Sequence, residues 1–501
     1  MPGHPGAASY KLQPGLLLLP TPSGAGTTDG GGVLLSPWPL MAMALNRNAF
    51  ALLAALSIPH GPTRGMTAEA AAAAAGLPPA DASAFLDRLA HRRLLVCTPL
   101  PPRQWPDVSI IVPARGRHRA TRACVQSLLA LDYPAEACEI IVVDDASEPP
   151  LAPALDGLPI RTIRLQRNAG QSVARNLAAV EARGELLAFI DNDCIAAADW
   201  LRVLVPHFGD AQLAIVGGRV VAPPPTGGTV GAFEAVRSPL DMGAMAAPVG
   251  PTEPVAYLAT CNFIVRRDVL LAEGGFVEEM RLGEDVDFTW RVLRAGHAAR
   301  YVPAGQVTHC HREGLLQLLQ RRADYASSEA DLQRRHPEGR RVLPVPRLGL
   351  LALTALTVLF PAPTAVIALG LLIAVLAGVE IGSKQRRLRR LGVALPIARV
   401  AAAVAREHLA SLHRLSANVL RYYGLPLLAL GLLWPGLWPA IAVVFVLAPL
   451  LDHGRLKPAC GLPAFALLSW LEMAAYQWGV WRGCIVGRTV RPLLPILHWK
   501  R

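Results

Sequence analysis

The chain has 501 residues, which is enough for two or three domains. Its apolar fraction of 52% and mean hydropathy of +0.34 are high for a purely soluble protein, and its net charge is +12. Such a basic balance is typical of proteins that bind nucleic acid, and also of proteins that bind an anionic membrane surface or a phosphate substrate; the local pattern along this chain favours the second group. The eight cysteines are scattered without a Cys-x-x-Cys pair, which argues for reduced thiols and against a disulfide framework or zinc site.

Residues 1–100 are expected to form a small first module. Two apolar runs, 16–19 and 33–35, flank a Gly-rich turn and predict a hairpin. The following segments predict a helix, a helix-turn-helix and a strand, at 48–56, 66–75, 80–89 and 92–96. This order resembles the winged-helix, PqqD-like peptide-recognition domains of peptide-derived cofactor pathways. A generic winged helix is the alternative, and the few basic residues in the helices argue against nucleic acid as a partner.

Residues 101–318 alternate strand and helix patterns, which predicts an α/β domain with a mostly parallel sheet. The apolar run 186–190 is a predicted buried strand that ends in Asp191 and Asp193. The carboxyl edge of such a sheet is where ligands bind, and carboxylate oxygens there suit Mg²⁺ or Mn²⁺ on a diphosphate. Taken alone, the Asp-x-Asp spacing at a strand end is more often a turn or a helix cap than a metal site.

Five motifs in this region, in this order, resemble the GT-A fold of family 2 glycosyltransferases. They are Val108–Pro113, Val143–Ser147, Arg167–Asn176, Phe189–Asp193 and Gly283–Arg291. The resemblance implies a Rossmann-like catalytic domain that uses a nucleoside diphosphate sugar as donor, UDP-glucose in particular, with Mn²⁺ or Mg²⁺ as cofactor.

The resemblance also implies which residues bind the nucleotide sugar. Asp145 is expected to contact the base or ribose, with Asp144 close behind it, and Pro113 lies at the same predicted edge. Arg167 and Arg175 flank a loop-to-helix turn, where guanidinium groups and helix N-termini favour phosphate. A capped turn for Asp145 and a solvated helix face for the arginines are the alternatives.

The expected metal ligands are Asp191, Asp193 and one histidine. Asp193 is the favoured direct ligand, and Asp191 is also assigned to the nucleotide sugar. The segment around His309 and His311 follows a late predicted strand, where the family commonly places a metal-binding histidine. His309 is chosen, with His311 in reserve, and imidazole suits Mn²⁺ better than Mg²⁺.

Asp285 is the candidate general base, which would take the proton of the acceptor hydroxyl in an inverting transfer. Like-charge repulsion from its neighbour Glu284 would raise its pKa. The alternative is that both carboxylates simply favour a helix N-terminus. Asn262, in a further stretch that matches the family, is expected to line the sugar pocket.

Residues 319–501 are expected to be basic, apolar, helical and membrane-associated. The uncharged stretch 348–379 is divided by two prolines into arms of 13 and 16 residues, which predicts a hairpin with both ends cytoplasmic or one kinked span. Residues 384–421 hold nine Lys or Arg and suit anionic lipid. Two further apolar stretches, 422–451 and 459–481, follow, and a buried helical domain is the alternative for all of these. The expected location is the cytoplasmic face of the cell membrane.

Taken together, the first module, the central domain and the segment 475–484 resemble glycosyltransferases that act on a peptide-derived redox-cofactor precursor. This implies that hexose units, one or several in succession, are moved onto that precursor. The segment 475–484 has Gln477 where a small residue is expected, so its role stays open. A Gln-x-x-Arg-Trp motif is absent, which argues against long polysaccharide synthesis. The alternatives are a cell-envelope glycosyltransferase with a lipid or glycan acceptor, and a binding-only protein.

Overall fold

A computed structural model describes residues 8–20, 30–37, 39–57, 65–223, 228–310, 314–339, 342–358 and 362–499. The chain divides into two compact units. The central unit contains residues 101–341 and 452–496, and the flanking unit contains residues 7–100 and 342–451. Each unit is therefore built from segments that are far apart in the sequence.

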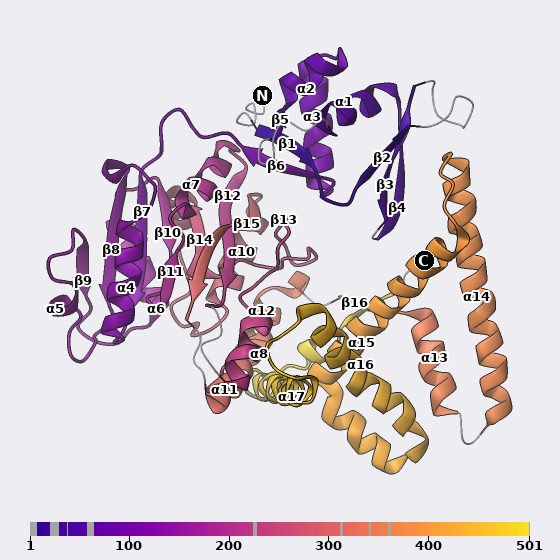
Figure 1. Ribbon diagram of the computed structural model, residues 1–501. Helices are drawn as coiled ribbons and strands as arrows, with labels where there is room; N and C mark the ends of the chain where they lie inside the picture. The colour runs from indigo at the N-terminus through magenta and orange to yellow at the C-terminus, as the bar shows by residue number, and fades with distance from the viewer. Residues whose placement is uncertain are drawn as a thin grey trace. The chain divides into compact units, whose positions relative to one another are not determined.

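A nine-stranded sheet forms the core of the central unit (Figure 1). Four neighbouring strands are parallel, in the order β10 (Leu186–Phe189), β7 (Val108–Ala114), β8 (Cys138–Asp144) and β9 (Arg161–Arg164). Every residue of β7 and β10 is buried, as expected for strands that are covered on both faces. The predicted buried strand at 186–190 is confirmed as β10.

The other side of the sheet is not parallel throughout. β14 (Phe263–Arg266) pairs antiparallel with β10 and with β12 (Leu213–Val221), which is parallel to β15 (Ala298–His309). β11 (Cys194–Ala196) and β13 (Ala247–Pro248) pair antiparallel with β15. The sheet is mixed rather than mostly parallel because the chain enters β14 from the carboxyl edge of β10, where the parallel strands end.

Helices cover both faces of this sheet. Alternate residues of β7 point to opposite faces, so Ile110 and Val112 belong to one hydrophobic cluster and Ile111 to another. The first cluster includes residues of α4 (His118–Leu129) and α7 (Trp200–Leu204). The second includes residues of three helices, α6 (Gln171–Glu181), α9 (Arg267–Ala272) and α10 (Glu284–Arg294).

The last long helix of the chain belongs to the central unit. α17 (Leu462–Val486) lies against α11 (Leu315–Ser327) and also contacts α8 (Thr229–Arg237) and α12 (Glu329–Arg335) (Figure 1). Its buried side chains include polar ones, among them Glu472. The third apolar segment predicted from the sequence therefore forms a helix with one side buried in the central unit, while Leu467, Trp470 and Trp478 stay exposed.

The flanking unit begins with two small three-stranded sheets, ordered β5-β1-β6 and β2-β3-β4. The predicted hairpin is confirmed, because Leu17 of β2 pairs antiparallel with Leu35 of β3. The predicted helices are also present and pack into one hydrophobic cluster with β1 and β6. The elements are β1 (Ala8–Leu12), β2 (Leu17–Pro20), β3 (Gly32–Pro37), β4 (Leu40–Leu45), α1 (Arg47–Ser57), β5 (Met66–Thr67), α2 (Ala68–Ala75), α3 (Pro79–His91) and β6 (Leu95–Pro99).

The flanking unit also contains the strand β16 (Val342–Val345) and four helices: α13 (Arg347–Thr357), α14 (Pro363–Arg390), α15 (Ile397–Leu433) and the larger part of α16 (Trp438–Leu456). In the described part of the chain, two helical segments are long and apolar enough to cross a membrane, 364–390 and 435–456. None of the most apolar window of the first is buried. The two proline-divided arms are unequal, because α14 continues without a break from the apolar stretch into the basic residues that follow it.

Candidate active site

A cavity of about 540 Å³ lies at the carboxyl edge of the parallel strands, entirely within the central unit. Its volume is in the range typical of small-ligand and cofactor pockets. The walls come from the loops after β7, β8 and β10, from the end of β15 and from one side of α11. The described lining residues are Pro113, Ala114, Arg115, Arg117, Asp145, Gln171, Asp191, Asn192, Asp193, His309, Gln317, Gln320, Arg321, Asp324 and Tyr325.

Asp144 is the last residue of β8 and closes the turn that follows it. Its carboxylate accepts hydrogen bonds from the backbone N–H of Ser147 at 2.8 Å and of Leu151 at 3.1 Å, and from Arg164 at 2.5 Å. Burial alone would raise the pKa of Asp144, but these donors together hold it below its ordinary value. Asp144 is not among the described residues that line the cavity, so its contacts are those of a structural carboxylate.

Asp145 lines the cavity, as the sequence favoured. Its two carboxylate oxygens accept hydrogen bonds from the backbone N–H groups of Ala169, at 2.7 Å, and Gly170, at 3.0 Å. These bonds fix the loop before α6 against the end of β8. Pro113 also lines the cavity, whereas Arg167 is exposed and does not belong to the described part of the wall.

Arg175 is buried and is not among the described residues that line the cavity. The guanidinium donates one hydrogen bond to Asp191 Oδ1 and another to Glu284 Oε1, both at 2.9 Å, and its side chain is only 1% exposed. Burial alone would lower the pKa of Arg175, but the two carboxylates raise it. The expected contact with phosphate does not match this position, because the buried side chain already joins two carboxylates from different elements.

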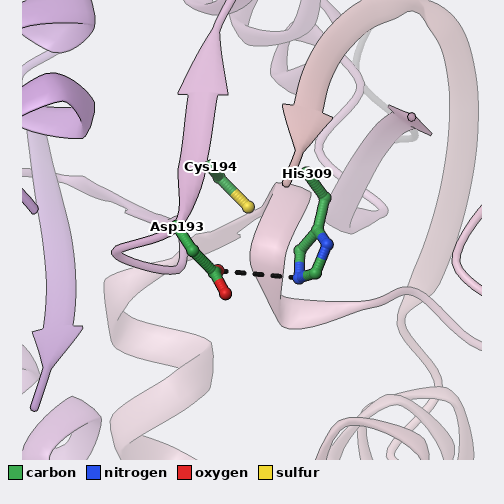
Figure 2. Close-up of side chains that lie close together, drawn as sticks. All are labelled: Asp193, Cys194 and His309. Carbon is green, nitrogen blue, oxygen red and sulfur yellow. Dashed lines mark ion pairs between the residues drawn. The ribbon is translucent and has the colours of Figure 1, made fainter. Parts of the chain in front are cut away.

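The candidate metal ligands Asp193 and His309 face each other across the cavity edge (Figure 2). His309 Nε2 lies 3.5 Å from Asp193 Oδ1, and the other oxygen of Asp193 accepts a hydrogen bond from Arg117. Ligand atoms of Asp193, Cys194 and His309 lie within 4.8 Å of one another, and Asp191 lines the same cavity. A carboxylate with an imidazole is a donor set that Mn²⁺ accepts, so these residues fit the expected ion. His311 lies outside the described residues.

The thiol of Cys194 is a poor candidate for a third ligand. A hydrogen bond with Cys261 and then burial raise its pKa well above the ordinary value, so the thiol keeps its proton. Thiols coordinate metals as thiolates, and thiolate prefers softer ions than Mn²⁺ or Mg²⁺. The oxygen and nitrogen donors of Asp193 and His309 are therefore the ligand pair that the site offers.

Glu284 and Asp285 begin α10, directly after Gly283 in the left-handed backbone region. Glu284 is buried, accepts hydrogen bonds from Arg175 and Gln171, and has its pKa raised mainly by burial. Burial first, and the charge of Glu284 second, raise the pKa of Asp285 to about 8. The expected direction of this shift is confirmed, with burial as the larger cause. Asp285 is not among the described lining residues.

Asn262 is fully buried and uses its amide within the sheet. Its Oδ1 accepts hydrogen bonds from Trp200 Nε1 at 2.8 Å and from the Gly218 N–H at 3.2 Å. Its Nδ2 donates to the carbonyl oxygens of Arg219 and Gly305, at 3.0 and 3.1 Å. The expectation that Asn262 lines a sugar pocket does not match this position, because all four hydrogen bonds tie strands and loops of the sheet together.

The contribution of α11 to the cavity was not predicted from the sequence. Gln317, Gln320, Arg321, Asp324 and Tyr325 line the wall, spaced three or four residues apart on one face of the helix. That spacing of polar residues is visible in the sequence of residues 317–325. Arg117, the partner of Asp193, was also missed because it belongs to a loop without a recognised motif.

Comparisons with known proteins identify a family and several relatives. Residues 109–271 match the family model described as glycosyl transferase family 2. The pre-mycofactocin glycosyltransferase of Mycobacterium tuberculosis is 29% identical over 399 residues, which cover 78% of this chain and 82% of that protein.

Two further relatives and one solved structure cover less of this chain. Glycosyltransferase AglE of Haloferax volcanii is 30% identical over 213 residues, 41% of this chain and 67% of that protein. Succinoglycan biosynthesis protein ExoO of Rhizobium meliloti is 30% identical over 248 residues, 46% of this chain and 69% of that protein. The mannosyltransferase PcManGT from Pyrobaculum calidifontis, solved with GDP-Man and Mn²⁺, has a TM-score of 0.38 at 18% identity and covers 71% of this chain and 90% of that chain.

Proposed function

The chain belongs to glycosyl transferase family 2, and on that premise we propose that it moves a hexose from a nucleoside diphosphate sugar to an acceptor hydroxyl with inversion. The observation that carries the proposal is the single cavity in which Asp145, Asp191, Asp193 and His309 meet. In this proposal Asp145 and Pro113 contact the nucleotide. The diphosphate lies toward Asp191 and Asp193.

Mn²⁺ or Mg²⁺ is the proposed cofactor, held by Asp193 and His309 with Asp191 beside them. When bound, the ion would neutralise the charge that develops on the departing diphosphate. Arg117 forms an ion pair with Asp193, and its side chain would change position when Asp193 binds the ion. Arg175 holds Asp191 and Glu284 in fixed positions, so it is proposed as a positioning residue.

Asp285 is the proposed general base, which accepts the proton of the acceptor hydroxyl as that oxygen attacks the anomeric carbon. Its raised pKa is what burial beside Glu284 predicts, and a base with a pKa near the working pH is effective. Because transfer is a single displacement in this proposal, one carboxylate base is sufficient.

The proposed acceptor is the peptide-derived precursor of mycofactocin, and the proposed donor is UDP-glucose, with one or several additions. The likeness to the pre-mycofactocin glycosyltransferase over 78% of this chain supports this choice, since it extends well beyond the family model. The two small sheets and three helices of residues 8–99 are the proposed peptide-recognition module. The proposed location is the cytoplasmic face of the membrane.

A cell-envelope glycosyltransferase with a lipid or glycan acceptor is the second candidate. The exposed apolar side chains of α14, including Ile367, Leu371 and Val375, favour it because they would bring the enzyme to a lipid surface. The name of the relative ExoO also refers to the synthesis of a glycan, succinoglycan.

A transfer assay tests both candidates. Purified protein with Mn²⁺ and labelled UDP-glucose is given either the peptide-derived precursor or a membrane lipid extract, with Asp285→Asn as the control. Label on the precursor that is lost in the variant supports the first candidate. Label found only in lipid supports the second candidate. If neither acceptor is labelled and the protein does not hydrolyse UDP-glucose, the proposed chemistry is contradicted.

A further inference from the structure

We propose that α17 positions α11, the helix that forms one wall of the cavity, so that residues 475–484 support the donor site from behind. The inference rests on the proposed function, because it takes the cavity to be the donor site. It gives a role to a sequence segment near the end of the chain that no catalytic group explains.

Two glycines let the helices touch backbone to backbone. A Cβ added at Gly479 would lie 2.0 Å from the carbonyl oxygen of Ala323, and one added at Gly483 would lie 2.3 Å from that of Ser327. Both glycines are on α17 and both carbonyls are on α11, with the same four-residue spacing. A side-chain rotation cannot relieve contacts with backbone atoms, so a larger residue at either position must move one helix.

A buried charge network fixes the same pair of helices. Arg322 of α11 donates to Glu472 of α17 at 2.6 Å and to Glu234 of α8 at 2.7 Å. Arg237 of α8 donates to the other oxygen of Glu472 at 3.0 Å and to Asp452 at 2.8 Å. All five side chains are mostly buried, and a buried charge that loses its partner is strongly destabilising. The network therefore holds one arrangement of α8, α11 and α17.

The face of α11 that contacts α17 is adjacent to the face that lines the cavity. Arg322 and Ala323 contact α17, while their neighbours Arg321 and Asp324 line the cavity. Arg482 of α17 also donates directly to Asp324 at 2.7 Å. Any displacement at the helix interface is therefore transmitted to the cavity wall without an intervening loop.

The test compares Gly479→Ala with a matched control, Gly231→Ala in α8. Both add one methyl group to a glycine within a helix of the central unit, but a Cβ at Gly231 has no neighbour within 4 Å. We expect the Gly479 variant to lose ~10- to 100-fold in kcat/KM for UDP-glucose hydrolysis, mainly through a higher donor KM. The control should keep the wild-type value.

Amide hydrogen exchange followed by mass spectrometry gives a readout that does not depend on activity. Faster exchange confined to α11 and α17 in the Gly479 variant is the expected result. Unchanged exchange in α11, or equal loss of protection across the central sheet, would overturn the positioning role. If the wild-type protein hydrolyses no donor but α11 still loosens, the proposed function fails while the positioning of α11 stands.

A second variant covers the case in which Gly479→Ala does not fold. Glu472→Gln keeps the shape of the side chain and removes its charge, so Arg322 and Arg237 lose part of their compensation. We expect donor KM to rise and α11 and α17 to lose protection in this variant too, but both effects should be smaller than in the Gly479 variant. Wild-type kinetics together with wild-type exchange in this variant would contradict the proposal.

Discussion

The pKa of Asp285 should set the pH dependence of the proposed transfer. Because burial and Glu284 raise its pKa to about 8, Asp285 is largely protonated at neutral pH and becomes a base as the pH rises. We expect kcat/KM for transfer to increase from pH 6 and to level off above about pH 8. Asp285→Asn should lower transfer by about 10²- to 10⁴-fold and remove this dependence. A flat profile for the unchanged enzyme would contradict the assignment.

The same residue should limit stability at alkaline pH. The pKa of Asp285 in the folded protein lies above the unfolded value of about 3.9, so its favourable contribution is complete below that value and is lost as the pH rises through about 8. We therefore expect Asp285→Asn to raise the thermal midpoint of the central unit more at pH 9 than at pH 5. Calorimetry at the two pH values measures this, and an equal shift at both would argue against a raised pKa.

Arg175 differs from Arg167, although both lie in the same sequence motif. Arg175→Met should cost about 3–5 kcal/mol of unfolding free energy, because it leaves the buried carboxylate of Glu284 without its charged partner. Arg167→Met removes an exposed guanidinium and should cost no more than about 0.5 kcal/mol. Urea unfolding of the two variants measures the difference, and similar costs would mean that Arg175 is not the structural link described here.

Among the strands and helices, the sequence predicted those that are marked by an apolar run and by their order along the chain. The strands 138–144 and 186–189 were found because each is an apolar run that leads into aspartates, and the strand 108–114 because its apolar run is followed by a basic turn. β14 was not predicted as a strand, because its few residues read as part of a motif and its antiparallel pairing depends on distant partners.

The candidate site was predicted only in part for similar reasons. The sequence favoured Asp145 over Asp144, but only the structure shows that Asp144 closes a turn and that Asp145 lines the cavity. Asn262 and Arg175 belong to family motifs, yet their side chains support the sheet and the carboxylates rather than the cavity. Motif membership indicated the part of the chain that surrounds the cavity, and burial decided the individual contacts.

The helix α14 joins an exposed apolar surface to an exposed basic end. Changing Arg386, Arg387 and Arg389 to Gln should weaken binding to anionic vesicles by ~100-fold, since each basic residue near such a surface contributes about 1 kcal/mol. The control changes Arg167, Arg183 and Arg202 of the central unit to Gln and alters the net charge equally. Vesicle sedimentation measures binding, and equal losses would mean that overall charge, not α14, attracts the protein.

The two compact units should differ in how much a bound ligand stabilises them. The cavity lies entirely within the central unit, so UDP with Mn²⁺ should stabilise that unit alone, by about 2.7 kcal/mol at a hundredfold excess over Kd. Calorimetry should then show one transition that moves with ligand and one that does not. A single transition, or two transitions that both move with ligand, would contradict the independent response of the two units.

The central unit is interrupted in the sequence by residues 342–451, which belong to the flanking unit. During translation, the ribosome therefore releases the sheet and α11 first, then the apolar helix α14, and only afterwards α17. At ~5–20 residues per second, α17 follows α11 after an interval on the order of 10 s. The apolar helix α14 of the nascent chain is therefore exposed to the cell before α17 is available to pack against α11, the helix that forms one wall of the cavity.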